Sequence, residues 1–261
     1  MNKFEYTYNL KRKTKKYVHE YPSSWNELSK EDLLYVSRLM NLNLPVEKFN
    51  IFLLRRFLGI PNKFLFSIDS KIFTELADTI TFIHEKKELT LNKLPELKIK
   101  KGLFSYILHG PESGMFNLSH EQFFGYCEPS FSNMISTGNN DYLDYLIASL
   151  YTFEKGVFNS SDVEKIKALV KRLKPEFKTA ILLFYMGSKD FFAYKFPKLF
   201  KNGSGNAKGL QSDLYFIELT DQLNSQNLSN NDQIKKTNIL EVFMRLTKMI
   251  ELSDQLKQKK K

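Results

Sequence analysis

The stretch 17–36, YVHEYPSSWNELSKEDLLYV, constrains the fold more than any other part of the chain. It opens as an extended run with aromatic residues and holds the only tryptophan, Trp25. Two pairs of residues have the spacing of a capping box: Ser24 with Glu27, and Ser29 with Asp32. The combination predicts a corner between a strand and a helix, with Trp25 buried at the junction and pinning the hairpin to the helix.

Composition sets the broad class of protein. The chain has 261 residues, of which 42% are apolar and 14% are aromatic, and this is enough to fill a core of that size. Its single cysteine, Cys127, excludes an intramolecular disulfide, and we expect it to be a small buried apolar residue. The sequence has neither a secretion signal nor an uncharged run of membrane-spanning length, so we expect a soluble protein.

Two segments alternate apolar and polar residues as strands do. The first, in 4–21, alternates on both sides of the basic turn LKRKTK and stops at Pro22, which cannot donate to a strand ladder. The second, in 97–108, turns at Lys101 and Gly102. We therefore expect two hairpins, and because an isolated hairpin is marginal in water, we expect them to pair into one small sheet.

Helical periodicity dominates the rest of the sequence. Apolar stripes predict helices over these ranges: 29–41, 45–59, 70–86, 119–135, 175–192, 211–224 and 235–257. Further helix starts are predicted at three capping signals: Ser119 with Gln122, Asn140 or Asp141, and Ser161 with Glu164. The predicted fold class is α+β and mainly α-helical, with a small N-terminal β-hairpin element packed on a multi-helix body.

Changes in composition divide the chain into four predicted segments. They are 1–110 with both hairpins and the first helices, 111–201 as the helical body, 202–209 as a flexible linker, and 210–261 as a C-terminal helical pair.

The net charge of +10 first suggests a nucleic-acid partner. Residues 3–16 carry +5 and residues 257–261 carry +4, which leaves only +1 on 17–256. A nearly neutral body lacks the broad basic face of a dedicated duplex-binding protein. A solvated turn and a frayed helix end explain the charged ends most simply, but an anion-binding role stays open for five residues of the turn: Lys11, Arg12, Lys13, Lys15 and Lys16.

No motif has a convincing catalytic or metal-binding pattern. GSGNAKG (203–209) places its lysine before the final glycine and follows no strand, so a linker explains it better than a phosphate loop. His109 and His120 have no helical i, i+4 partner for a metal. Asp141 and Asp144 fall in the first turn of a helix, where carboxylates stabilise the helix start. We therefore predict no catalytic residue, no cofactor and no metal site.

Two apolar patterns have both a functional and a structural explanation. Aromatic residues in 191–200 interleave with lysines, as on a single-strand-binding surface, but core packing explains them more simply. The closing helix carries a stripe that we predict to bind a partner helix or groove, and the alternative is that the stripe completes the core. Its members are Ile239, Val242, Phe243, Leu246, Met249 and Ile250.

Five short segments carry a resemblance to a known group of proteins: YPSSWNELS, LSHEQFFGY, LDYLIASLYTF, FYMGSKDFF and KKTNILEVFMRL. In this order, after an opening hairpin, they resemble helix-rich proteins encoded in Bacteroidota phages and prophages among tail-morphogenesis genes. The resemblance implies an assembly or adaptor role of the tail-assembly-chaperone type, in the bacterial cytoplasm or in association with the virion. It brings no catalytic residues. Phe153 and Glu154 depart from a basic, proline-containing continuation, which leaves the subfamily and the partner open.

Because no catalytic pattern is found, the resemblance leads us to expect a non-enzymatic phage or mobile-element accessory protein that acts by protein–protein binding, as a tail-assembly chaperone or a virion adaptor. The alternative is a nucleic-acid-associated protein that uses the basic N-terminal turn and the C-terminal tail. An enzyme whose site is assembled from scattered residues is a third hypothesis.

Overall fold

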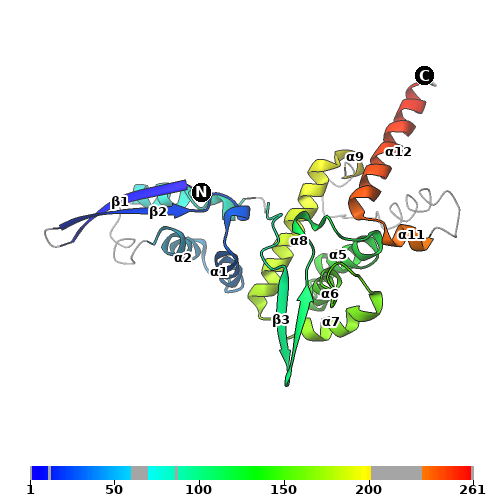
Figure 1. Ribbon diagram of the computed structural model, residues 1–261. Helices are drawn as coiled ribbons and strands as arrows, with labels where there is room; N and C mark the ends of the chain where they lie inside the picture. The colour runs from blue at the N-terminus through cyan, green and yellow to red at the C-terminus, as the bar shows by residue number, and fades with distance from the viewer. Residues whose placement is uncertain (1, 11–12, 60–69, 86–87, 201–230, 260–261) are drawn as a thin grey trace. The chain divides into compact units, whose positions relative to one another are not determined.

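The computed structural model describes residues 2–10, 13–59, 70–85, 88–200 and 231–259 (Figure 1). The fold is α+β and mainly α-helical, as predicted. The chain forms two compact units: Met1–Leu89 with Pro175–Met186, and Thr90–Lys174 with Gly187–Lys261. The predicted linker 202–209 and the predicted helix 211–224 lie outside the described residues.

The first unit opens with a hairpin of β1 (Asn2–Leu10) and β2 (Lys13–Tyr21), which pair antiparallel. The elements that follow are η1 (Trp25–Glu27), α1 (Lys30–Met40), α2 (Val46–Leu58), α4 (Ser70–Asp78), η2 (Thr81–Ile83) and the first part of α8 (Pro175–Lys195). Strand β2 contacts α2, so the hairpin packs on helices as predicted.

The corner predicted around Trp25 is present. Trp25 is 1% exposed, and its Nε1 donates a hydrogen bond of 2.8 Å to the carbonyl of Phe82. The two rings meet edge to face with centroids 6.2 Å apart. The burial of Trp25 is thereby confirmed, but its hydrogen bond ties the corner to η2, 57 residues later, rather than to the start of α1.

The two helix-start signals beside Trp25 have different outcomes. The Ser29 hydroxyl accepts a hydrogen bond from the backbone N–H of Asp32 at 3.1 Å, so the predicted cap of α1 is confirmed. The Ser24–Glu27 capping box is wrong, because the Glu27 carboxylate accepts hydrogen bonds from the backbone N–H and the hydroxyl of Ser23. Element η1 is one turn of 3-10 helix, and Ser24 precedes it with extended backbone and makes no side-chain capping bond.

The predicted helix 70–86 is shorter than expected. Helix α4 ends at Asp78, and only the single turn η2 follows. The hydroxyls of Thr79 and Thr81 donate to the carbonyls of Leu76 and Asp78, at 2.6 and 3.0 Å. Such side-chain bonds to carbonyls compete with the helical pattern and favour a turn at this point.

The second unit contains the other hairpin, β3 (Glu96–Lys101) and β4 (Phe104–His109). Its helical elements are η3 (Ser113–Met115), the π-helix η4 (Glu121–Cys127), α5 (Glu128–Thr137), α6 (Asn140–Leu150), η5 (Ser160–Asp162), α7 (Val163–Val170), the last part of α8, α9 (Pro197–Phe200), α11 (Asn231–Lys236) and α12 (Ile239–Lys259).

The predicted pairing of the two hairpins into one sheet is wrong. Strands β1 and β2 form one two-stranded sheet, and β3 and β4 form another. Each hairpin instead contacts a helix of its own unit, α2 for β2 and α7 for β3. These contacts supply the packing that an isolated hairpin lacks in water.

Two predicted caps in the second unit are wrong as well. The side-chain oxygen of Asn139 accepts from the N–H of Asp141 at 2.9 Å, so Asn139 caps α6 in place of Asn140 or Asp141. The side-chain oxygen of Asn159 accepts from the N–H of Ser161 at 3.1 Å and caps η5. In both cases the asparagine bonds the N–H two residues later, and a search for capping-box spacing does not detect that turn.

Phenylalanine rings fill much of the core of the second unit. Phe243 of α12 is fully buried at the centre of this cluster. The rings that lie 5.1–5.9 Å from it, between centroids, are those of Phe123, Phe124, Phe192, Phe196 and Phe200. Edge-to-face and tilted ring pairs of this kind add to the free energy of burial, so the four phenylalanines of 191–200 serve as packing residues, whereas Tyr194 is 81% exposed.

Candidate functional site

His109 and His120, the two histidines weighed as metal ligands, have different neighbours. His109 Nδ1 is 3.6 Å from Glu96 Oε1, and the His120 ring lies 5.2 Å from that of Phe124. Burial lowers the pKa of His120 to about 4, so its imidazole is neutral at physiological pH. Among the residues that the structure describes, no group of three or more His, Cys, Asp or Glu side chains has the arrangement of a metal site.

Asp141 is part of a brace between α6 and α7. Its carboxylate accepts from Lys167 Nζ at 2.5 Å and from Lys171 Nζ at 3.0 Å, and these hydrogen bonds lower the pKa of Asp141. Lys167 Nζ also lies 3.4 Å from the centroid of the Tyr145 ring, and the Tyr145 hydroxyl donates to Glu164. Burial disfavours the charged form of Lys167, but its hydrogen bonds outweigh this effect and raise its pKa. The carboxylate of Asp141 and the two lysines therefore form structural ion pairs. Glu164 is not part of a capping box, although its spacing from Ser161 predicted one.

Lys189 belongs to a second ion pair in the same unit. Its Nζ lies 2.6 Å from the carboxylate of Glu128, whose side chain is buried, and 4.5 Å from the centroid of the Phe131 ring. A charge held in such a pair costs free energy to remove, because its partner would be left buried and uncompensated. Lys189 therefore belongs to a structural ion pair rather than to a surface that binds single-stranded nucleic acid.

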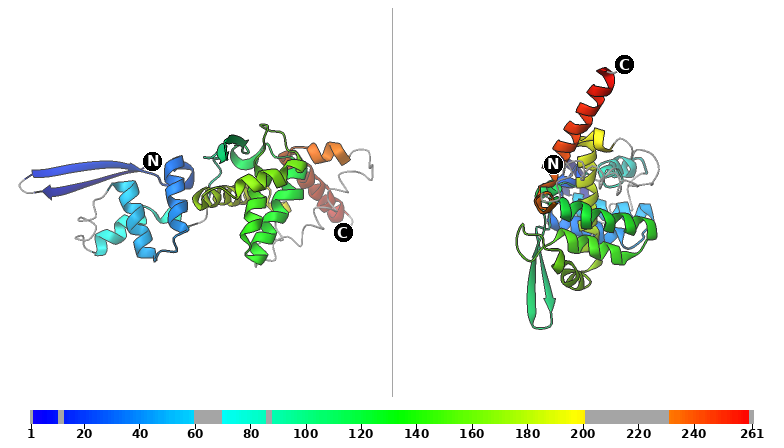
Figure 2. Two further views of the ribbon diagram at one scale, coloured as in Figure 1. Left: turned by 90° about the horizontal axis from the view of Figure 1, so that it is seen from below. Right: turned by 90° about the vertical axis from the view of Figure 1, so that its right-hand side faces the viewer.

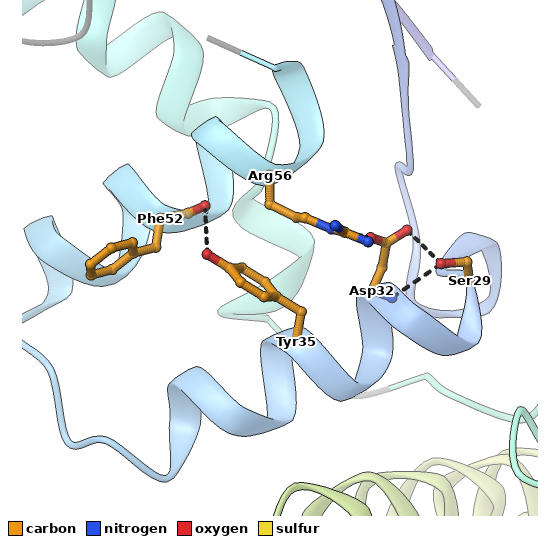
Figure 3. Close-up of polar contacts among 5 residues, drawn as sticks. All are labelled: Ser29, Asp32, Tyr35, Phe52 and Arg56. Atoms are coloured by element: carbon orange, nitrogen blue, oxygen red, sulfur yellow. Dashed lines mark hydrogen bonds and ion pairs between the residues drawn. The ribbon is translucent and has the colours of Figure 1, made fainter. Parts of the chain in front are cut away.

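A polar network that the sequence did not predict joins α1 to α2 (Figure 3). The Asp32 carboxylate accepts from the hydroxyl of the cap Ser29 and from Arg56 Nε, each at 2.7 Å. The Arg56 guanidinium carbon lies 5.6 Å from the centroid of the Tyr35 ring, and the Tyr35 hydroxyl donates to the carbonyl of Phe52 at 3.5 Å. The Asp32 carboxylate therefore holds the hydroxyl of the capping residue Ser29 and also pairs with Arg56 of the neighbouring helix, which makes this network structural.

The predicted anion-binding residues are only partly described. The backbone of Lys13, Lys15 and Lys16 forms the start of β2, directly after the turn. Lys11 and Arg12 lie outside the described residues. The anion-binding role of this turn therefore stays a prediction.

The first half of α12 is anchored in the core. The segment before it pairs with the start of η4: the N–H of His120 donates to the carbonyl of Thr237 at 2.8 Å, and the N–H of Ile239 donates to that of Leu118 at 2.9 Å. This bridge breaks the predicted helix 235–257 into α11 and α12. Four of the six predicted partner-binding residues are buried: Ile239, Val242, Phe243 and Leu246.

The second half of α12 is different. Met249 and Ile250 are half-buried, while Leu252 is 52% exposed and Leu256 is 62% exposed. Met249, Leu252 and Leu256 recur at i, i+3 and i+7, so they lie on one face of the helix. This end of α12 extends beyond the other described elements of its unit (Figures 1 and 2). The apolar stripe predicted from the sequence ends at Ile250. The same helical spacing, extended beyond that residue, would have included Leu252 and Leu256.

The tip of the β3–β4 hairpin is also apolar and exposed. Leu103 is fully exposed and Phe104 is 71% exposed, next to Gly102, whose φ of 61° suits the left-handed conformation of the turn. The hairpin extends beyond the helices of its unit (Figure 2). Three exposed lysines stand beside the tip, none of them in an ion pair within the described ranges: Lys98, Lys100 and Lys101.

A pocket of about 160 Å³ opens between the end of α6, the segment 151–159 and α7. Buried Tyr151 and Ile166 line its interior, and exposed Glu154 and Val157 line its rim. The hydroxyl of Tyr151 donates to the carbonyl of Leu94 at 2.7 Å, which fixes this wall of the pocket. The sequence did not predict this pocket, because its lining comes from separate elements and a turn.

No helix in the described part of the chain combines the length and apolarity needed to cross a membrane. Comparison of the chain with protein-family models, with curated proteins and with solved structures finds no match.

Proposed function

We propose that this chain acts by binding another protein, as a non-enzymatic accessory factor in phage or mobile-element assembly. The observation that supports this most is the second half of α12, where exposed Leu252 and Leu256 continue an apolar stripe whose first half is buried. An exposed apolar stripe on an anchored helix suits a partner helix or a partner groove. The interface we propose comprises Met249, Ile250, Leu252 and Leu256.

The tail-assembly role rests on the resemblance of the five segments quoted above. On this proposal the partner is a tail or virion protein, met in the cytoplasm of the bacterial host or carried in the virion. A chaperone or adaptor must bind and then release or place its partner. Two exposed leucines fit that need, since burial of each contributes about 2 kcal/mol before the costs of association.

Co-expression with the products of neighbouring tail-tube and tape-measure genes tests this interface. We expect the double variant Leu252→Glu, Leu256→Glu to keep its circular dichroism spectrum and to lose co-purification of the partner. Met244→Glu is the matched control, because Met244 is 63% exposed on the same helix but lies on another face. Phe243 is unsuitable for this purpose, because its replacement by Glu would place a charge in the ring cluster.

The co-purification experiment has one outcome that supports the proposed interface and one that excludes it. Loss of the partner with the leucine variant and retention with Met244→Glu would support α12 as the interface. Equal co-purification with all three proteins would exclude it. A gene neighbourhood of replication or recombination genes would favour the nucleic-acid hypothesis instead.

A further inference from the structure

Two surfaces of the second unit are complementary in size, apolarity and charge, and neither includes α12. The first, the hairpin tip, consists of Leu103 and Phe104 with the three lysines beside them. The second is the pocket beside α6 and α7, with buried Tyr151 inside and Glu154 on its rim. The tip and the pocket rim are both exposed to solvent in the single chain.

The pocket has the size of a single apolar side chain. A dry cavity of about 150 Å³ holds a benzene molecule, which matches the ring of phenylalanine. The pocket of about 160 Å³ can therefore take the ring of Phe104 or the side chain of Leu103. Its lining includes the rings of Phe153 and Phe158, against which an inserted apolar group would pack.

Glu154 on the pocket rim carries the charge opposite to that of the tip lysines. Glu154 is exposed and makes no ion pair within the described part of the chain. Asp162, which also lines the pocket, already binds Lys165 at 2.8 Å, so Glu154 is the carboxylate open to a new partner. The tip lysines supply the opposite charge. Charges of this kind at the rim of an interface speed association and fix its register.

The tip is not seated in the pocket of its own chain, because Leu103 is fully exposed and Phe104 is 71% exposed. His109, at the base of the hairpin, exchanges two backbone hydrogen bonds of 2.8 and 2.9 Å with Thr152, where the pocket segment begins. Nearer the tip, the ring of Tyr106 in β4 lies against that of Phe153 in the pocket lining, with centroids 6.4 Å apart. The paired strands between this base and the tip, where Lys101 lies opposite Phe104, hold the tip in its exposed position.

We therefore infer that the chain self-associates head to tail, with the β3–β4 tip of one copy seated in the pocket of the next. Because the two copies use different surfaces, the contact is heterologous and leaves one tip and one pocket open in a dimer. Repetition of the contact produces a ring if the rotation closes, or an open filament if it does not.

Sedimentation velocity of the full chain over a wide concentration range tests this inference. The tip variant is Leu103→Asp, Phe104→Asp, and the pocket variant is Glu154→Lys, Val157→Trp. All four positions are exposed, so we expect both variants to fold. Each variant should raise the concentration of half-association by about 30-fold or more, as for the loss of an interface hot spot.

Mixing the two variants gives the sharpest result. The pocket variant keeps its tip and the tip variant keeps its pocket, so the mixture should form a one-to-one complex of near-normal affinity and stop there. A mixture that stays monomeric would overturn the inference, as would wild-type chain that stays monomeric up to its solubility limit. If Val157→Trp disturbs the fold, Glu154→Lys with the reciprocal Lys100→Glu tests the same contact by restoration of the opposite charges.

Two controls isolate the contact. Ile135→Asp changes another exposed apolar residue of the same unit, 56% exposed, and should leave association unchanged. The α12 variant Leu252→Glu, Leu256→Glu should also self-associate normally. Loss of self-association in the α12 variant but not in the tip variant would overturn this inference, while leaving the partner-binding proposal intact.

Discussion

Trp25 and Phe82 meet through two contacts although 57 positions separate them in the chain: an indole Nε1 hydrogen bond of 2.8 Å and an edge-to-face ring pair. The bond satisfies the only polar atom of a side chain that is 1% exposed. The corner after the first hairpin is therefore closed by a long-range contact.

Replacing Trp25 by Ala should destabilise the first unit by about 3 kcal/mol or more, because it leaves a large cavity in the core. Trp25→Phe should cost less, since it keeps an aromatic ring but leaves the Phe82 carbonyl without its donor. Urea unfolding followed by far-ultraviolet circular dichroism measures both. A loss below about 1 kcal/mol for the alanine variant would show that the indole adds little to packing.

Gly110 should not tolerate a side chain. A Cβ at this position would lie 2.7 and 2.9 Å from atoms of the Tyr151 ring, which is itself held by its bond to Leu94. Gly110→Ala should therefore cost about 1–3 kcal/mol through overpacking. Gly125→Ala is the matched control, because the nearest atom to its added Cβ is an ordinary contact at 3.7 Å. Equal thermal unfolding of the two variants would contradict this prediction.

Stability of the second unit should fall as the pH drops below the ordinary pKa of histidine. Burial lowers the pKa of His120 to about 4 in the folded state, whereas the unfolded chain takes up the proton near pH 6.5. Between these values the unfolded state binds more protons, so acidification favours unfolding. The loss attributable to His120 should reach about 2 kcal/mol between pH 7 and pH 5.

Chemical unfolding of wild type and His120→Gln across that pH range isolates the histidine. The variant should have a flatter dependence of unfolding free energy on pH. Parallel curves for the two proteins would mean that His120 is protonated in the folded state as readily as in the unfolded chain.

Any binding of nucleic acid through the charged ends should be weak, independent of sequence and strongly reduced by salt, because few phosphates are neutralised. Fluorescence anisotropy with a labelled duplex measures it. Binding should disappear in a variant that lacks 257–261 and has neutral residues at five positions: Lys11, Arg12, Lys13, Lys15 and Lys16. Salt-resistant binding by that variant would place a site on the body of the chain and favour the nucleic-acid hypothesis.

Local signals predicted some helix boundaries and missed others, such as the asparagine turns that cap α6 and η5, while long-range contacts decided how the elements pair. Ser29 marks the start of α1 as expected, because a cap is a bond between near neighbours. The burial of Trp25 was predictable from its size and position, but its partner Phe82 was not. The hairpins were predicted individually, whereas their separation into two sheets depends on the helices that each contacts.

The apolar stripe of α12 was likewise predictable from local spacing, whereas its burial was not. Periodicity marks one continuous stripe on the last helix, and it cannot tell where the stripe leaves the core. That point depends on how far α9 and the ring cluster around Phe243 cover α12, and these contacts join residues far apart in the sequence. The buried Phe243 and the exposed Leu256 therefore look alike in sequence and differ in the structure.

The position of the single tryptophan gives the chain an optical label for one of its two units. Trp25 belongs to the first unit, and the second has no indole. Emission excited at the red edge of the absorption band, where tyrosine contributes little, should therefore follow the first unit alone. Comparison of that signal with backbone circular dichroism would show whether the two units melt in one transition or in two.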